Sequence, residues 1–412
     1  MGVSLLGLGS YVLLLAVFRH APTSDVAAFG SFWALSFGLV GGVMLPFEQL
    51  MVRATAEGVS ESSGGESSTI APSNVLRLYL VVSVALSLGL VLGSSTLANR
   101  LLGGEQGLAY ILAGYVLVSA GQSWQRGRAA GGGRLDIYGR QLGIDGGARL
   151  AVGAAFLLSD SGDVHLAALG LLVAGLVSLP FSQTPQLSAK HKTGRMRTLA
   201  REAMLLSSAS TISLWLLNAG PVVVVVMGAP PMVAASFAPL FVITRVPLLF
   251  QASLQSVVLA RVVTHRELGD TAGLRRSVVT AVSSVAIAGV GVIIGFGVMA
   301  DAWAGLLYGP RFQLGILAGS GLALSTALFL IAAVGHVALV GLNATSRAAA
   351  AWMATAIAFV MVLLWVPGDV IERVVAAYVF AGVMLLVLQA VSLAPKMRHG
   401  PGPGQPGAGM NG

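Results

Sequence analysis

The sequence contains no cysteine and few charged residues. Without cysteine, disulfides, thiol chemistry and cysteine metal sites are all excluded. Charged residues make up 10% of the 412 residues, whereas a typical soluble domain has roughly 25%. Because a soluble chain of this length needs a polar surface, this composition argues against one.

Features of enzymes, metal sites and nucleic-acid binding are also missing. The six histidines have no metal-ligand spacing, and no Walker A sequence, nucleotide-binding glycine fingerprint or nucleophile elbow is present in a suitable context. The one acid–base cluster, Asp160, Asp163 and His165, lies in a short loop and is interpreted as solvated. The formal net charge of +8 comes from loops between apolar runs, where basic residues orient a membrane protein. We therefore expect no enzyme activity, cofactor, metal or nucleic acid.

Long apolar runs dominate what is present. The mean hydropathy is +0.85, and apolar runs recur at the length that a helix needs to cross roughly 30 Å of hydrocarbon. The sequence predicts an all-α polytopic membrane protein with about twelve transmembrane helices. The predicted spans are 2–18, 27–52, 75–96, 107–124, 142–158, 166–183, 203–227, 233–259, 277–299, 313–341, 350–366 and 374–393.

The distribution of Lys and Arg predicts the orientation. Of 24 such residues, 17 fall in alternate loops and the C-terminal tail, four fall in the opposite loops and three fall within spans. Since basic loops stay on the cytoplasmic side, both termini are expected there. Arginine outnumbers lysine 21 to 3, a bias that favours a GC-rich bacterial genome. The expected location is a bacterial cytoplasmic (plasma) membrane.

The longest basic loop divides the chain. We predict an N-terminal six-helix lobe at 1–183, a cytoplasmic linker at 184–202 and a C-terminal six-helix lobe at 203–395. The Gly/Pro-rich residues 396–412 are expected to be a disordered cytoplasmic tail. Two lobes around a central cavity are a common transporter plan. No strong residue-level repeat links the two halves.

Arg245 is the most deeply embedded ionisable residue. It lies 12 residues from the start and 14 from the end of its predicted span, and Pro247 follows closely. A charge at this depth is costly unless a partner or a cavity compensates it, and proline favours a break in the helix. A basic residue beside a broken helix indicates a substrate site. An internal salt bridge is the alternative.

Other polar residues within the spans have both structural and functional interpretations. Glu48, just after Pro46, either pairs with Arg53 or another helix or takes part in gating. Asp145 and Arg149 are four residues apart on one helix face, which allows an ion pair. Arg77 is near enough to its span end to snorkel, and Asn218 closes a polar stripe that either joins helices or lines a hydrated cavity.

These residues give two candidate sets. Embedded arginines outnumber the acids, which favours an anionic ligand such as a phosphate. The substrate-binding candidates are Arg245, Arg149, Arg77 and Asn218. The gating or ion-coupling candidates are Glu48 and Asp145.

Several segments resemble a known family. They are PFEQLMVR (46–53), RGRAAGGGRLDIYGRQLGIDGGARL (126–150), ITRVP (243–247) and LLYGPRF (306–312). Their order and spacing are similar to those of the Wzx-like polysaccharide flippases of actinobacterial type, within the multidrug/oligosaccharidyl-lipid/polysaccharide (MOP) superfamily. In that family a basic residue often precedes a proline, as at Arg245, and an arginine follows an acidic–Gly pair, as at Arg149.

The resemblance implies a function. It implies that the chain moves a polyprenyl-diphosphate-linked oligosaccharide from the inner to the outer leaflet by alternating access, for cell-surface polysaccharide biosynthesis. The implied partners are this lipid-linked oligosaccharide, membrane lipids and a polysaccharide polymerase or glycosyltransferases. The alternatives are a multidrug cation antiporter of the same fold, a membrane glycosyltransferase or polymerase, and a scaffold for polymer assembly.

Overall fold

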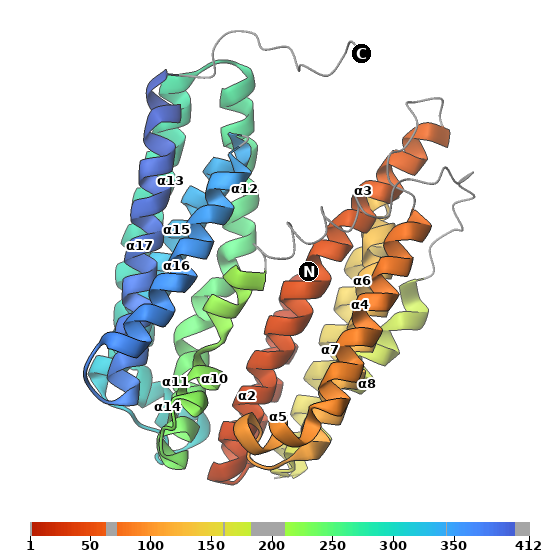
Figure 1. Cartoon of the computed structure of the whole chain (residues 1–412), viewed down its shortest axis with the longest axis vertical. Helices are drawn as coiled ribbons and strands as arrows, with labels where there is room; N and C mark the ends of the chain where they lie inside the picture. The colour runs from red at the N-terminus through yellow and green to blue at the C-terminus, as the bar shows by residue number, and fades with distance from the viewer. Residues whose placement is uncertain (1, 63–71, 160, 183–210, 343, 400–412) are drawn as a thin grey trace. The chain divides into compact units, whose positions relative to one another are not determined.

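The computed structural model describes residues 2–62, 72–159, 161–182, 211–342 and 344–399. Within these ranges every regular element is a helix, so the predicted all-α polytopic fold is confirmed (Figure 1). Nine of the described helices are long and apolar enough to cross a membrane, or ten if one bent pair forms a single span. Each of the twelve predicted spans falls on a described helix, although the seventh is described only from residue 211.

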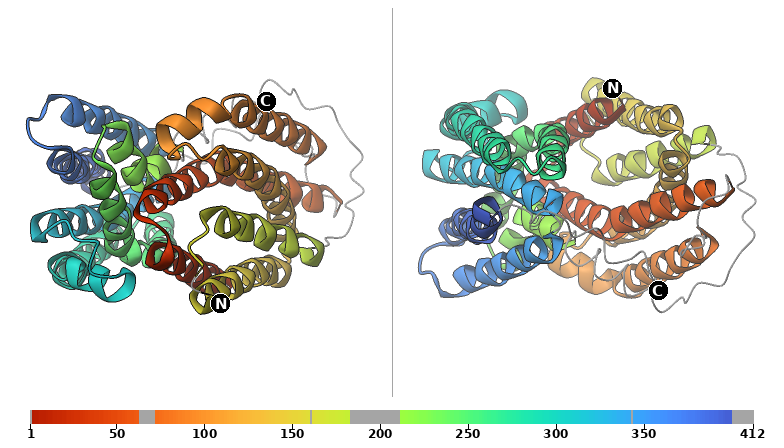
Figure 2. Two further views of the ribbon diagram at one scale, coloured as in Figure 1. Left: turned by 90° about the horizontal axis from the view of Figure 1, so that it is seen from below. Right: turned by 90° about the horizontal axis from the view of Figure 1, so that it is seen from above.

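The helices form two compact units, Met1–Pro239 with Gly305–Phe312, and Leu240–Ala304 with Gln313–Gly412. Within each unit the helices run side by side, as the end-on views show (Figure 2). The elements of the first unit are α1 (Gly2–His20), α2 (Thr23–Leu39), η1 (Val40–Met44), α3 (Leu45–Ser62), α4 (Pro72–Leu92), α5 (Ser94–Leu101), α6 (Gln106–Gly131), α7 (Leu135–Ser159), α8 (Val164–Ser178), η2 (Leu179–Ser182), α10 (Gly220–Val226) and most of α11 (Pro231–Arg245).

The second unit begins within α11. Its further elements are η3 (Val246–Phe250), α12 (Gln251–Glu267), α13 (Thr271–Val292), η4 (Ile293–Val298), the start of α14 (Ala300–Tyr308), α15 (Ile316–Gly341), α16 (Thr345–Trp365) and α17 (Val370–His399). The predicted linker, 184–202, lies outside the described residues. The division of the chain into lobes at this linker stays a prediction.

Several helices and helix boundaries differ from the sequence prediction. The short helices α5 and α14 were not predicted, because neither is long enough to give a spanning signal. α7 begins at Leu135, seven residues before the predicted start at 142. The prediction started too late because the first two turns of the helix carry charged and polar residues, which lower the hydropathy. α17 continues to His399 and so includes the first four residues of the predicted tail.

The second predicted span of each lobe, 27–52 and 233–259, lies on a long helix that is interrupted near its middle. The helix from Thr23 to Ser62 contains the π-helical segment η1, and the helix from Pro231 to Glu267 contains the 3₁₀ segment η3 directly after Arg245. The predicted break beside Arg245 is therefore present. At η1, the Thr211 hydroxyl donates to the Gly42 carbonyl (2.6 Å) and the Tyr79 hydroxyl donates to the Met44 carbonyl (3.0 Å). These side chains bond carbonyls at a point where regular helical bonding changes.

Polar side chains cap helices outside the spans. Asp163 accepts hydrogen bonds from the backbone of His165 and Leu166 at the start of α8. Asp270 accepts from the backbone N–H of Gly273 at the start of α13, and this bond holds the pKa of the Asp270 carboxyl below its ordinary value. Such caps satisfy N–H groups that have no partner within the helix.

Glycines allow α1 and α7 to pack backbone to backbone. A β-carbon at Gly146 would lie 2.5 Å from the Leu6 α-carbon, and one at Gly153 would lie 2.8 Å from the Leu13 backbone nitrogen. Small residues allow this close approach between membrane helices. The packing matters for function because it brings α1 against the centre of α7, where Asp145 and Arg149 lie.

We expect Gly146→Ala to destabilise the protein by about 1–3 kcal/mol, because the methyl group forces the α1 and α7 backbones apart. The adjacent Gly147→Ala is the matched control. A β-carbon there has only an ordinary contact, 3.9 Å to a Leu5 methyl group, and alanine favours a helix by about 0.5–1 kcal/mol over glycine. Thermal unfolding of the purified protein in detergent should lower Tm for the first variant alone. Equal Tm values would contradict the close packing.

Candidate functional site

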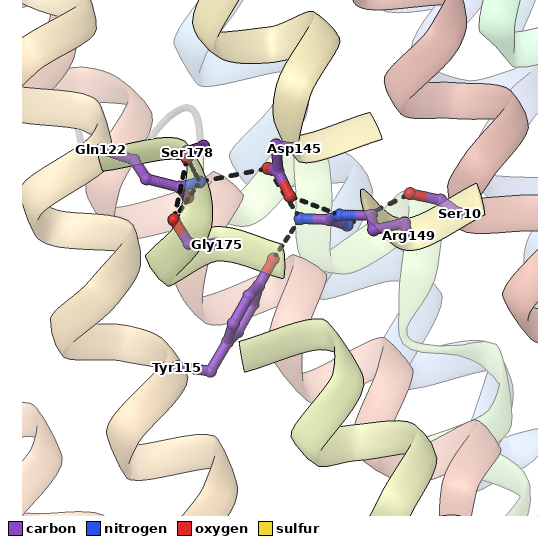
Figure 3. A network of polar contacts seen from close by, with 7 residues as sticks. All are labelled: Ser10, Tyr115, Gln122, Asp145, Arg149, Gly175 and Ser178. Atoms are coloured by element: carbon purple, nitrogen blue, oxygen red, sulfur yellow. Dashed lines mark hydrogen bonds and ion pairs between the residues drawn. The ribbon is translucent and has the colours of Figure 1, made fainter. Parts of the chain in front are cut away.

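Asp145 and Arg149 form a buried ion pair at the centre of α7. The Arg149 Nε donates to Asp145 Oδ1 (2.9 Å) and one Arg149 terminal nitrogen donates to Asp145 Oδ2 (3.1 Å). The other Arg149 terminal nitrogen donates to the Ser10 hydroxyl (3.1 Å). The nitrogen that reaches Asp145 Oδ2 also donates to the Tyr115 hydroxyl (3.0 Å), as Figure 3 shows. The arginine thus has partners on α1, α6 and α7.

The network continues from Asp145 to α8. The Gln122 amide donates to Asp145 Oδ2 (3.2 Å) and to the Ser178 hydroxyl (2.8 Å), which in turn donates to the Gly175 carbonyl (2.8 Å; Figure 3). The exposed fractions of Asp145 and Arg149 are 2% and 4%. Because each charge is neutralised by the other, these contacts favour the structural interpretation of the pair over an anion site or ion-coupling site.

Glu48 is also bound by an arginine. Its Oε2 accepts from the Arg126 Nε (2.9 Å), and an Arg126 terminal nitrogen donates to the Ser123 hydroxyl (2.9 Å). The sequence prediction offered Arg53 or another helix as the partner, and the structure shows Arg126 on α6. The predicted span ended at 124, which placed Arg126 in a loop. In the structure α6 extends seven residues further, so Arg126 lies on the helix. The pair joins α3 to α6.

We expect Glu48→Gln to lower the free energy of unfolding by about 1–3 kcal/mol, since the variant loses a charge-assisted hydrogen bond in a buried setting. The pH dependence of transport should not change, because the carboxylate anchors two helices. Glu105→Gln, at an exposed glutamate that faces His165, is the control and should leave Tm unchanged. A shifted pH profile with wild-type Tm would instead assign Glu48 to ion coupling.

Two further candidates have less suitable positions. The Arg77 side chain is exposed in the second turn of α4, as expected for an arginine that reaches the membrane surface. The Asn218 amide donates to the Leu214 carbonyl of the preceding turn (2.9 Å). The predicted polar stripe that ends at Asn218 also includes Ser207, Ser208 and Ser210, which lie outside the described residues. Neither Arg77 nor Asn218 is brought to Arg149 or Glu48 by a described contact.

Arg245 lies in an aromatic cage within the second unit. It is 5% exposed, at the C-terminal end of α11. Its guanidinium carbon lies 4.7 Å from the ring centroid of Phe241, 4.9 Å from that of Tyr378 and 5.5 Å from that of Phe329. One terminal nitrogen donates to the Thr326 hydroxyl (3.1 Å). These contacts, with one hydroxyl and three aromatic faces, orient the guanidinium.

More aromatic rings extend the cage. The Trp352 ring stacks on Phe329 at a centroid distance of 6.2 Å, and Phe359 packs edge-on against Tyr378 at 4.9 Å. The Trp352 Nε1 donates to His336 Nδ1 (3.2 Å), so the His336 ring packs at the edge of the cage. Sequence reasoning missed these rings, although Phe241 lies four residues before Arg245 and so on the same helix face.

Arg311, in the LLYGPRF segment, was another residue that sequence reasoning missed. One of its terminal nitrogens lies within hydrogen-bonding distance of three carbonyls where α1 ends, and the shortest distance is 2.7 Å to Ala21. A cation is favourable at the C-terminus of a helix. This segment therefore fastens α1 to residues 305–312 within the first unit.

The chain matches no protein-family model and no curated protein. Its structure is similar to that of a multidrug resistance MATE family transporter of the MOP superfamily in an inward-facing conformation. The TM-score is 0.78, with 14% identity over 96% of both chains. An outward-facing structure of a MATE family transporter of the same superfamily gives a TM-score of 0.64 at 14% identity, over 96% of this chain and 93% of the other.

A third similar structure has a binding pocket of reversed polarity. It is a MOP superfamily transporter from Pyrococcus furiosus Vc1 (DSM3638) whose reverse polarity of the binding pocket suggests a different function. Its TM-score is 0.61 at 14% identity, over 96% of this chain and 93% of the other. The chain thus has the fold of MOP superfamily transporters, and this fold is solved in both inward- and outward-facing conformations.

Proposed function

We propose that this protein moves a polyprenyl-diphosphate-linked oligosaccharide across the bacterial cytoplasmic membrane by alternating access. The single observation that carries this proposal is Arg245, buried beside a broken helix and held by a hydroxyl and three aromatic faces. A guanidinium donates to phosphate oxygens in a bidentate geometry, which suits a diphosphate.

The energetic argument supports an anionic substrate. A charge near the middle of a span costs several kcal/mol even on lenient insertion scales. Arg149 and Arg126 each have a carboxylate partner within a hydrogen bond. An anionic headgroup that visits Arg245 during the cycle would lower the cost of this cation in the same way.

A multidrug cation antiporter of the same fold is the second candidate. The structural similarity to multidrug resistance MATE family transporters favours this candidate. That activity requires a carboxylate that faces the cation, and the buried carboxylates of Asp145 and Glu48 are each held by an arginine. The Pyrococcus transporter shows that this fold is also found with a pocket of reversed polarity.

The test is direct transport by the purified full-length chain in liposomes. We expect the protein to expose a fluorescent polyprenyl-diphosphate oligosaccharide to a membrane-impermeant quencher on the opposite side. We expect no efflux of a cationic dye under an imposed proton or sodium gradient. Dye efflux without movement of the lipid-linked sugar would establish the antiporter instead.

The proposed orientation, with both termini in the cytoplasm, predicts which loops react with an impermeant thiol reagent. The chain has no native cysteine, so all labelling by the reagent comes from the single cysteine that is introduced. We expect Ser161→Cys, between α7 and α8, to label in intact cells. Leu268→Cys, at a side chain that is 74% exposed between α12 and α13, should label only after permeabilisation. The opposite pattern would reverse the topology.

A further inference from the structure

An apolar groove runs along the end of α4 and over α5, within the first unit. Its cavity volume is about 620 Å³, and its lining includes Gly89, Leu90, Gly93, Leu97, Arg100 and Val225. Two glycines leave the floor without side chains. A β-carbon at Gly89 would have no neighbour within 4 Å. The same end of α4 also carries the exposed side chains of Leu88 and Leu92, which are 55% and 85% exposed.

Arg100 places one positive charge at the end of this groove. Its side chain is exposed near the C-terminus of α5. α4 is a candidate membrane span that ends at Leu92, so we expect Arg100 to lie close to the headgroup region. Thr96 adds a hydroxyl to the same lining. Glu105, between α5 and α6, faces His165 at 3.3 Å.

We propose that this groove binds an anionic phospholipid with a single phosphate diester. Charge complementarity favours it: one arginine balances one phosphate charge, while the apolar lining covers an acyl chain. A diphosphate lipid carries more negative charge than the groove matches. This site is separate from Arg245 and does not depend on the proposed substrate.

The experiment measures lipid binding to the purified full-length protein by native mass spectrometry, with phosphatidylglycerol, phosphatidylcholine and polyprenyl diphosphate as probes. Arg100→Gln should weaken phosphatidylglycerol binding about five-fold, because one arginine near a membrane surface contributes about that factor. It should leave phosphatidylcholine binding unchanged. Gly89→Leu, which fills the groove without a backbone clash, should weaken binding of both lipids.

Two matched controls accompany these variants. Arg19→Gln removes another exposed arginine at a helix end, and Gly291→Leu fills the open space beside an exposed glycine of α13. Neither should change binding. Equal losses from Arg100→Gln and Arg19→Gln would indicate a diffuse charge effect and overturn the site. Weaker binding of polyprenyl diphosphate, with phosphatidylglycerol unaffected, would assign the groove to the transported lipid and also overturn the proposal.

Discussion

Arg245→Ala should abolish transport of the lipid-linked substrate while the protein still inserts and folds. The substitution removes the cation that the aromatic faces of Phe241, Phe329 and Tyr378 orient. Because the diphosphate loses a charge-assisted bidentate contact, we expect at least a 100-fold loss of transport rate, on the order of 3 kcal/mol. The measurement is the liposome assay, with the amount of folded protein determined in parallel by size-exclusion chromatography.

Arg245→Lys and Arg276→Ala separate recognition from general charge. Lysine keeps the positive charge but lacks the planar fork, so this variant should recover only part of the transport rate. Arg276 is an exposed arginine early in α13, and its replacement should leave transport unchanged. Full transport by Arg245→Ala would exclude Arg245 from the substrate site. Loss of folded protein in both Arg245 variants would instead indicate a structural role.

Asp145→Asn should cause the largest loss of stability. It leaves Arg149 buried without its countercharge, and breaking a buried pair from one side costs about 3–5 kcal/mol. Ser10 and Tyr115 still accept hydrogen bonds from the guanidinium, but neither neutralises it. We expect a strongly lowered Tm in detergent and little folded protein in the membrane fraction.

Two comparisons test the cause of this loss. The double variant Asp145→Asn/Arg149→Met removes both charges and should recover much of the folded protein, because no uncompensated charge remains. Asp136→Asn, in the first turn of α7, breaks the exposed pair with Arg134, which precedes the helix. It should leave Tm unchanged, since exposed ion pairs contribute little. An unchanged Tm for Asp145→Asn would show that the pair does not stabilise the fold.

Much of the architecture was predictable because the membrane imposes a simple length requirement. Hydropathy placed every predicted span on a described helix, and Pro247 indicated the break after Arg245. The four-residue spacing predicted the contact of Asp145 with Arg149. Helix boundaries were less accurate, since α7 begins seven residues earlier than predicted.

The sequence by itself determined which segments are membrane helices and which ionisable residues lie within them, because burial in hydrocarbon depends on local composition. Only the tertiary structure decided which of those charges are neutralised. Glu48 accepts a hydrogen bond from Arg126, which is 78 residues away in the sequence, and Arg149 donates one to Ser10, which is 139 residues away. Arg245 contacts Thr326 across 81 residues. Such contacts depend on how each helix is rotated about its own axis, and in this chain the packing of neighbouring helices sets that rotation.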